Sequence, residues 1–364
     1  MNVKKRHLCC SLFAMGVVLS ACQSNGSANE PQPSEPQQEA VENEQEENMR
    51  TISYTVGEDD AKVSVDELIQ TLDGELTFDE LHRTLEMTIH EDQYRLIDGV
   101  TVLERNGEYL ATDEIYLIEE EGELYLPVAF LEVGLGLEVT FQEKEVAFQW
   151  FGPAERVGGP PEGFDFDEWD VDTMVDYLSF LERPIQGAQV STIDSHLPGA
   201  PREYRNGFHE GIDWYDFATG GNISRETPVY AMAEGIVVRA DHDFEDYESP
   251  EVRNADLALT AELGETPEYI FDRLRGQQVW VQYPNGVMNR FAHLSGIPED
   301  LQVGDRVNAE TVIGYVGNSG TSSAVNGNLD DDLHLHQDLL IYGELFWKPL
   351  TLEETKEVLQ KIWP

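Results

Sequence analysis

The chain has 364 residues, which is enough for two domains with hydrophobic cores of their own in addition to terminal segments. Its 23 lysines and arginines oppose 71 aspartates and glutamates, so the formal net charge is −48. A surface this acidic repels phosphate backbones, which argues against nucleic-acid binding, and it does not adhere to anionic lipid by charge alone. External salt would screen the repulsion, so the composition indicates a salt-loving or alkali-loving bacterium; an acidic protein without that adaptation is the alternative.

Residues 1–21 have the pattern of a secretory signal peptide. Three basic residues at positions 4–6 precede an apolar run at 8–19 that is too short to span a bilayer. The run ends in Leu19-Ser20-Ala21-Cys22, which resembles the bacterial lipobox. This resemblance implies cleavage before Cys22, attachment of lipid to that cysteine, and an extracytoplasmic protein anchored to the membrane and facing the cell wall. An ordinary signal peptide that happens to end near a cysteine is the alternative.

The cysteine count agrees with a lipid anchor. Only Cys9, Cys10 and Cys22 occur, so cleavage leaves a single cysteine, which the lipid occupies, and no disulfide can form within the mature chain. Cleavage also removes three basic residues and changes the formal charge to −51, so the lipid and not the charge would hold the protein to the membrane. Residues 22–49 are polar and acidic with almost nothing apolar to bury, which predicts a disordered tether.

Residues 50–150 predict a small α+β domain. The stretch at 63–72 is compatible with a helix, and the stretches at 87–90 and 116–118 predict strands. Farther along, residues 122–148 resemble the stalk domain named after the N-terminal region of copper amine oxidases. The resemblance implies a strand, a short helix packed on it and more strands.

Copper is not implied by that resemblance. His82 and His90 stand alone in the sequence, without the cluster of ligands that a metal needs, and isolated histidines are usually surface or satisfied core groups. We therefore interpret the stalk domain as a spacer or a module that contacts the cell wall.

Residues 151–183 predict a linker and a helix. The linker part is rich in Gly, Pro and acidic residues. Asp170 then precedes apolar residues spaced for one face of a helix, with Asp170 as its cap and Pro184 as its end. The apolar positions are Val171, Met174, Val175, Leu178 and Leu181.

The last domain, residues 184–364, is dominated by strands. Alternating or continuous apolar runs at 228–240, 278–283 and 290–294 lie between Gly and Pro breaks. Thr351 and Glu354 form a capping box that predicts a closing C-terminal helix.

Four of the nine histidines fall in three short motifs of this domain. His209 and Asp213 are four residues apart, and His334 and His336 share one face of an expected strand, because side chains on a strand repeat every two residues. His293 lies on another expected strand. Two imidazoles and a carboxylate make a zinc site that leaves a position for water, which is the catalytic pattern and not the closed structural one. A His-x-His pair alone is weak evidence, because it also arises by chance.

The histidine motifs occur together with other short motifs in a fixed order. Phe208-His-Glu-Gly-Ile-Asp213, Arg290-Phe-Ala-His-Leu-Ser295, Val312-Ile-Gly-Tyr-Val-Gly-Asn-Ser-Gly320 and Leu333-His-Leu-His336 follow one another, and together they resemble the LytM/lysostaphin-type zinc endopeptidases. The resemblance implies that His209, Asp213 and His336 hold one zinc ion per chain. It also implies that His293 and His334 act as general base or stabilise the transition state. Tyr204 lies upstream of the first motif, where some relatives keep a tyrosine that steadies the oxyanion, although its spacing is inexact.

Two stretches depart from the family pattern. Residues 241–276 form an insertion of helical character and residues 318–332 form a long connection; both are expected to border the groove, so substrate choice does not transfer. After His336 the chain continues Gln337-Asp338 in place of the common aromatic-acid pair.

The sequence therefore predicts a mainly β protein, with an antiparallel β peptidase domain that has an open groove, preceded by the α+β stalk domain. The leading function is a zinc-dependent metalloendopeptidase that hydrolyses peptide bonds in bacterial peptidoglycan. One alternative is a binding or regulatory module of the same fold that activates another wall hydrolase without cutting. Another is a zinc peptidase that acts on a protein outside the wall. The sequence does not identify a regulatory protein partner.

Overall fold

The computed structural model describes residues 48–57, 61–152, 156–203 and 207–364, and residues 48–364 form one compact unit. The signal peptide, Cys22 and the tether lie outside the described residues, as does Tyr204. Within the described part of the chain, no helix is long and apolar enough to cross a membrane.

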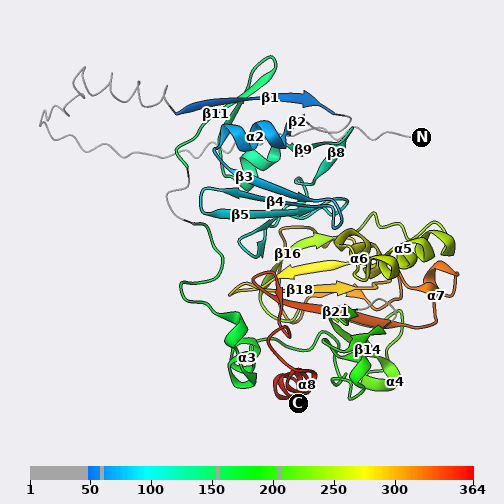
Figure 1. Ribbon diagram of the computed structural model, residues 1–364. Helices are drawn as coiled ribbons and strands as arrows, with labels where there is room; N and C mark the ends of the chain where they lie inside the picture. Colours follow the sequence, from blue (N-terminus) through cyan, green and yellow to red (C-terminus); the bar gives the residue numbers. More distant parts are fainter. Residues whose placement is uncertain (1–47, 58–60, 153–155, 204–206) are drawn as a thin grey trace, which may run out of the picture. The chain divides into compact units, whose positions relative to one another are not determined.

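The N-terminal part contains two antiparallel sheets around one apolar core. The first sheet has the strand order β10 (Val139–Phe141), β11 (Glu145–Gln149), β1 (Met49–Val56), β2 (Ala61–Ser64), β9 (Glu123–Pro127) and β8 (Ile118–Glu120). The second has the order β3 (Glu75–Asp79), β4 (Thr84–Ile89), β5 (Asp92–Ile97), β6 (Glu104–Arg105) and β7 (Glu108–Tyr109). Figure 1 shows the short helix α2 (Val65–Thr71) beside β1 and β2.

The local predictions for this part are mostly confirmed. The helix expected at 63–72 occupies Val65–Thr71, and the strand expected at 87–90 lies largely within β4. Residues 122–148 contain a strand, a short π-helix η1 (Phe130–Gly134) and two more strands, as the stalk resemblance implies. The strand expected at 116–118 is wrong, because β8 begins only at Ile118. Leu117 instead fills the core as part of an irregular segment.

The C-terminal part is built on a seven-stranded antiparallel sheet, which confirms the mainly β prediction. Its order is β14 (Ile212–Tyr215), β21 (His334–Ile341), β18 (Val287–Ala292), β17 (Val279–Gln282), β16 (Gly235–Ala240) and β19 (Arg306–Val307), with β22 (Glu344–Leu345) also paired to β21. Two small sheets accompany it, β12 (Pro201–Arg202) with β13 (Gly207–Phe208) and β15 (Pro228–Tyr230) with β20 (Val312–Tyr315).

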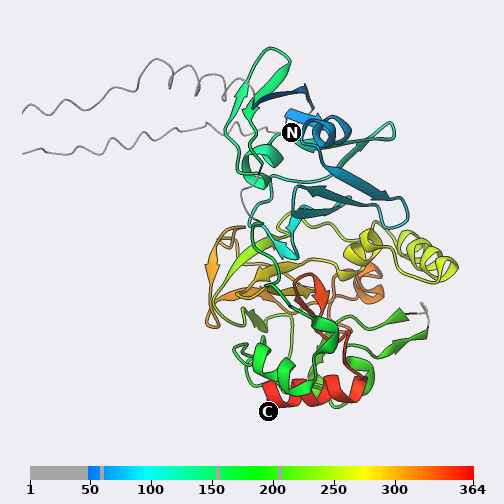
Figure 2. The same cartoon turned by 60° about the vertical axis from the view of Figure 1, so that its left-hand side comes forward.

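Two helices cover this part and lie side by side in both ribbon views, α3 (Val171–Leu178) and α8 (Leu352–Ile362) (Figures 1 and 2). Asp170 caps α3 by accepting a hydrogen bond from the Thr173 N–H, and the capping box of α8 is present. Pro184 does not end α3. The helix stops at Leu178, and Leu181 continues into the core as part of the following irregular segment.

Strand β21 organises the site. All eight of its residues are buried, and their side chains alternate between two faces of the sheet. Leu335, Leu339 and Ile341 belong to the large apolar core. The other face carries His334, His336 and Asp338.

Candidate metal centre

The register between β14 and β21 brings the predicted ligands together. Asp213 lies directly opposite His336, and Tyr215 lies opposite His334. His209 comes from the segment between β13 and β14, where its backbone N–H donates to the Ala200 carbonyl at 2.8 Å. His336 therefore meets His209 and Asp213, which lie 127 and 123 positions earlier in the sequence, at one end of the sheet.

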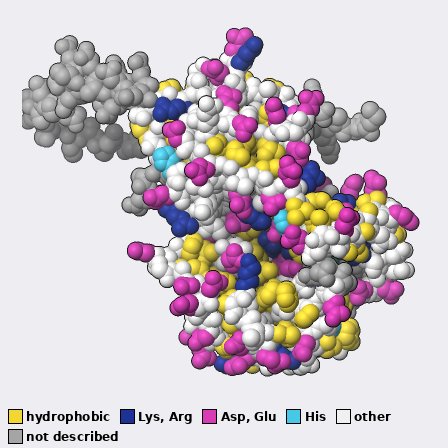
Figure 3. Space-filling model, viewed as in Figure 1, with side chains coloured by type: hydrophobic (Ala, Val, Ile, Leu, Met, Phe, Trp, Pro, Cys, Tyr) yellow, Lys and Arg dark blue, Asp and Glu magenta, His cyan; other side chains and the backbone are white. Residues whose placement is uncertain are grey.

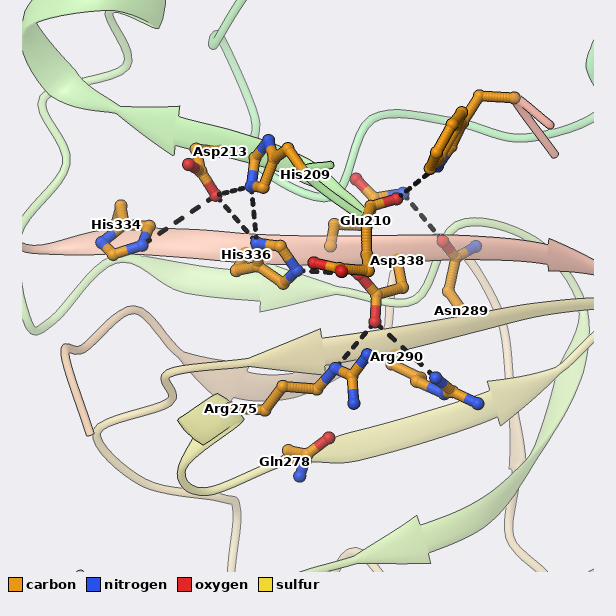
Figure 4. A network of polar contacts seen from close by, with 12 residues as sticks. His209, Glu210, Asp213, Arg275, Gln278, Asn289, Arg290, His334, His336 and Asp338 are labelled. Carbon is orange, nitrogen blue, oxygen red and sulfur yellow. Dashed lines mark hydrogen bonds and ion pairs between the residues drawn. The ribbon is translucent and has the colours of Figure 1, made fainter. Parts of the chain in front are cut away.

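Three donor atoms converge on one point (Figure 4). The distances are 3.1 Å from His209 Nε2 to Asp213 Oδ1, 3.2 Å from His209 Nε2 to His336 Nδ1, and 2.8 Å from His336 Nδ1 to Asp213 Oδ1. Tetrahedral zinc with bonds near 2.1 Å separates its ligand atoms by about 3.4 Å, so a shift of a few tenths of an ångström would admit the ion. Within the described residues this is the one group of three His, Cys, Asp or Glu side chains that could hold a metal ion.

The outer nitrogen of each ligand imidazole is also fixed. His209 Nδ1 lies 3.1 Å from the Leu197 carbonyl oxygen, and His336 Nε2 lies 2.7 Å from Asp338 Oδ1. A ring nitrogen that donates to an oxygen leaves the other nitrogen to face a metal, so these contacts set both the tautomer and the ring orientation. His209 therefore presents Nε2 and His336 presents Nδ1.

The electrostatics of the three donors also suit a cation. Burial alone would raise the pKa of Asp213, but the charge and hydrogen bonds of His209 and His336 hold it well below its ordinary value. Burial lowers the pKa of His336, but Asp338 and Asp213 outweigh it and raise the pKa to about 9. His336 thus holds a proton between Asp213 and Asp338. A divalent ion would replace this proton, since metal ligands bind in their deprotonated form.

His293 and His334 lie beside the converging donors. Their ring centroids are 4.7 Å apart, and the His293 ring is 5.8 Å from that of His336. In each ring Nδ1 contacts a backbone carbonyl oxygen, that of Ser319 at 2.7 Å and that of Asp332 at 2.8 Å. These contacts leave both Nε2 atoms available for proton transfer.

His293 departs from the expected strand position. Strand β18 ends at Ala292, and His293 follows it with a φ of 58° in the left-handed region. Burial lowers the pKa of both His293 and His334, so both rings are neutral at neutral pH.

A cavity of about 640 Å³ opens over these residues. Several of its lining residues were not predicted from the sequence. Tyr215 stacks on His334 with centroids 4.3 Å apart, and Arg202 donates to Asp213 Oδ2 at 3.4 Å. Strand alternation from Asp213 would have found Tyr215, but nothing in the sequence marks Arg202 or His196.

The insertions border the cavity as expected. Residues 241–276 contain α5 (Pro250–Leu263) and α6 (Glu268–Arg275), which confirms their helical character (Figure 1). The connection at 318–332 contains the short helix α7 (Ser322–Val325). The insertions contribute Arg253, Leu257, Phe271, Leu274, Arg275, Thr321, Ser322 and Asp332 to the lining.

Comparison with known families agrees with both resemblances. Residues 261–344 match the model of peptidase family M23, and residues 41–149 match that of the copper amine oxidase N-terminal domain. The C-terminal domain is therefore similar to LytM-type domains, and the N-terminal domain is similar to the copper amine oxidase N-terminal domain. The M23 match includes His293, His334 and His336 but begins after Asp213, so the assignment of the earlier motif depends on the geometry above.

Several solved structures are similar in part. They include the catalytic domain of lysostaphin from Staphylococcus simulans (23% identity, 41% of this chain and 77% of that chain, TM-score 0.25). The catalytic domain of the prophage-encoded M23 protein EnpA from Enterococcus faecalis shares 18% identity over 46% of this chain and 92% of its own, with a TM-score of 0.27. A chain of the SpoIIQ–SpoIIIAH pore forming complex shares 18% identity over 45% and 85%, with a TM-score of 0.28. No curated protein sequence matches significantly.

Proposed function

We propose that this protein is a zinc-dependent endopeptidase that hydrolyses peptide bonds in bacterial peptidoglycan. The observation that carries the proposal is the convergence of His209 Nε2, Asp213 Oδ1 and His336 Nδ1 within 3.2 Å, next to two further neutral histidines. A zinc ion held there would polarise a peptide carbonyl and bring the pKa of a bound water near neutrality.

The chain's own residues supply the proton transfers in this proposal. His334 is buried, His293 is half-buried, and both are neutral and line the cavity, so one of them can accept a proton from the attacking water and return it to the leaving amine. Their Nδ1 contacts with backbone carbonyls keep the rings from rotating away. Tyr215 stacks on His334 and limits its motion further.

The test is metal analysis together with wall hydrolysis. We expect one zinc ion per purified chain and clearing of purified sacculi, with release of muropeptides that mass spectrometry can assign to a bond. A zinc-loaded protein that binds sacculi without clearing them would favour a regulatory module that acts through another hydrolase. Cleavage of casein but not of sacculi would instead indicate a peptidase for proteins outside the wall.

The proposed location is the outer face of the cell membrane, with a lipid on Cys22 and the acidic tether between lipid and enzyme. The support is the lipobox-like sequence that ends at Cys22. Replacement Cys22→Ala should abolish labelling by radioactive palmitate and leave the signal uncleaved or the protein abnormally released. Palmitate incorporation that persists in the variant would rule out this anchor.

A further inference from the structure

One face of β21 joins the metal centre to the N-terminal domain. His334, His336, Asp338 and Leu340 follow one another at every second position, so they share that face. Leu340 belongs to an apolar cluster with Trp280 and Met288 on the same sheet and with Ile97, Val100, Val102 and Tyr109 of the N-terminal domain. The domain contact therefore begins two residues beyond Asp338.

A buried chain of polar contacts runs along this face. His336 Nε2 contacts Asp338 Oδ1 at 2.7 Å, and Asp338 Oδ2 accepts from Arg275 Nε at 2.8 Å. Arg290, opposite Asp338 in the sheet, places Nη1 3.9 Å from the same oxygen. Its Nη2 donates to the hydroxyl oxygen of Tyr109 at 3.0 Å. Figure 4 shows the part of this chain from His336 to Arg290.

Every member of the chain is withdrawn from water. Asp338 is 0% exposed, and the other members are at most 7% exposed. In such surroundings a charge without a partner is costly, so each member fixes the orientation of the next. Asp338 has its pKa lowered, because Arg275 and His336 outweigh the effect of burial.

Tyr109 itself is held firmly. Its ring meets Trp280 edge to face at a centroid distance of 5.2 Å, and its backbone N–H donates to Gln282 Oε1 at 3.0 Å. The Arg290 guanidinium lies 4.5 Å from the Trp280 ring centroid. Arg290 Nε has no hydrogen-bond partner within the described structure, so the Tyr109 hydroxyl provides one of the few hydrogen-bond contacts that hold this cation in place.

We propose that the N-terminal domain is a working part of the metal centre and that Tyr109 is its positioning residue. The Tyr109 hydroxyl holds Arg290, Arg290 and Arg275 hold Asp338, and Asp338 holds the His336 ring with Nδ1 toward the metal position. Docking of this domain thereby sets the metal affinity of the other. The inference rests on the proposed function for the role of His336, and its test uses a readout that needs no peptide cleavage.

The test replaces a single hydroxyl. Tyr109→Phe keeps the ring contact with Trp280 and removes the hydroxyl that contacts Arg290 and that also interacts with the buried Glu104. We expect zinc affinity, measured by competition with a chelating dye, to fall about tenfold, the lower end of the cost of losing an outer contact of a metal ligand. The visible spectrum of the cobalt-substituted protein should change with it, and kcat should fall with KM unchanged. Tyr125→Phe is the control, because the Tyr125 hydroxyl contacts only Glu123 at the surface.

A double-mutant cycle separates a positioning role from simple domain adhesion. Tyr109→Phe and Asp338→Asn both interrupt the same series of polar contacts, so their effects on zinc affinity should not add. Ile97→Val weakens the apolar contact between the domains and leaves the polar contacts intact. It should therefore lower Tm without changing zinc affinity. Unchanged zinc affinity and cobalt spectrum in a folded Tyr109→Phe variant would overturn the inference; if that variant does not fold, Arg290→Lys gives the same decision. Zinc binding without wall clearing by the wild type would contradict only the proposed function.

Discussion

His293 shows how one backbone angle shapes the site. A residue with a side chain rarely adopts a positive φ, and such strain persists only where surrounding contacts enforce it. Here the His293 N–H donates to the Arg275 carbonyl at 2.8 Å, while Nδ1 contacts the Ser319 carbonyl oxygen. The turn directs the ring toward His334 instead of continuing the alternation of β18.

Alanine substitutions at four positions of the site should separate metal binding from chemistry. His336→Ala or Asp213→Ala removes a converging donor, so zinc and activity should be lost together. His293→Ala or His334→Ala should keep about one zinc ion per chain while turnover falls by about 10²–10⁴, the usual contribution of a positioned acid or base. The measurements are metal content and rate of sacculus clearing. Full clearing by the His293 and His334 variants would show that these two residues have other roles.

At the scale of elements, a buried ion cluster fastens the insertion to the sheet. Arg239 of β16 contacts Asp272 of α6 at 3.0 Å and Asp241 at 2.7 Å, and Gln278 Nε2 donates to Asp272. Burial raises the pKa of Asp272, but Arg239 outweighs it and lowers the pKa below its ordinary value. Since α6 supplies Phe271 to the cavity lining, this cluster also supports the groove.

Arg239→Gln should destabilise the fold. It leaves two carboxylates buried together, which costs about 3–5 kcal/mol in the free energy of unfolding. In the wild type the lowered pKa of Asp272 gives stability that is present at neutral pH and lost as pH falls through that pKa, below 3.8, whereas burial raises the pKa of Asp241, which contributes the opposite dependence. In the variant both carboxylates lose the Arg239 cation, so their pKa values should rise. The pH dependence of the cluster's contribution to stability then reverses: the contribution should be greatest in acid and fall as pH rises.

Urea titrations at several pH values measure both effects. Lys361→Gln is the control, because Lys361 pairs with Asp172 and Glu357 on an exposed surface, where such pairs contribute less than about 1 kcal/mol. Equal losses in the two variants would mean that the buried cluster is not an anchor.

The sequence predicted those elements whose cause is local. The N-cap of α3, the capping box of α8, the alternation of β21 and the helices of the insertion all follow from residues that are close together in the sequence. It also predicted the three converging donors, through a family resemblance. The contacts of Asp338 with Arg275 and of Arg290 with Tyr109 were not predictable, because strand register and domain contact depend on residues up to 181 positions apart.

At the scale of the whole molecule, charge dominates the surface. Figure 3 shows acidic side chains spread over the visible face, with basic ones fewer between them. With 23 basic and 71 acidic residues, most carboxylates have no cation to pair with, and their mutual repulsion opposes the compact state.

The protein should therefore be more stable in concentrated salt. At about 1 M ionic strength the Debye length falls to about 3 Å, so repulsion between surface carboxylates is largely screened. We expect Tm to rise between dilute buffer and molar NaCl, measured by circular dichroism, with a parallel rise in activity. Sucrose at matched osmolality is the control for nonspecific effects. A Tm that stays level or falls would leave the acidic composition without a role in salt tolerance.

The burial of strand β21 also determines how the fold behaves when zinc is absent. Because the strand is buried along its whole length and paired on both sides, His334 and His336 are held in place by the sheet itself. The scaffold is thus preorganised, unlike a zinc finger, whose binding energy is its folding energy. Chelation by EDTA should abolish activity and leave the far-UV spectrum intact, and zinc added afterwards should restore activity within mixing time. Loss of secondary structure on chelation would mean that the ion is a structural support. Under the proposed function, the folded protein would stay inert without zinc and become active when zinc binds.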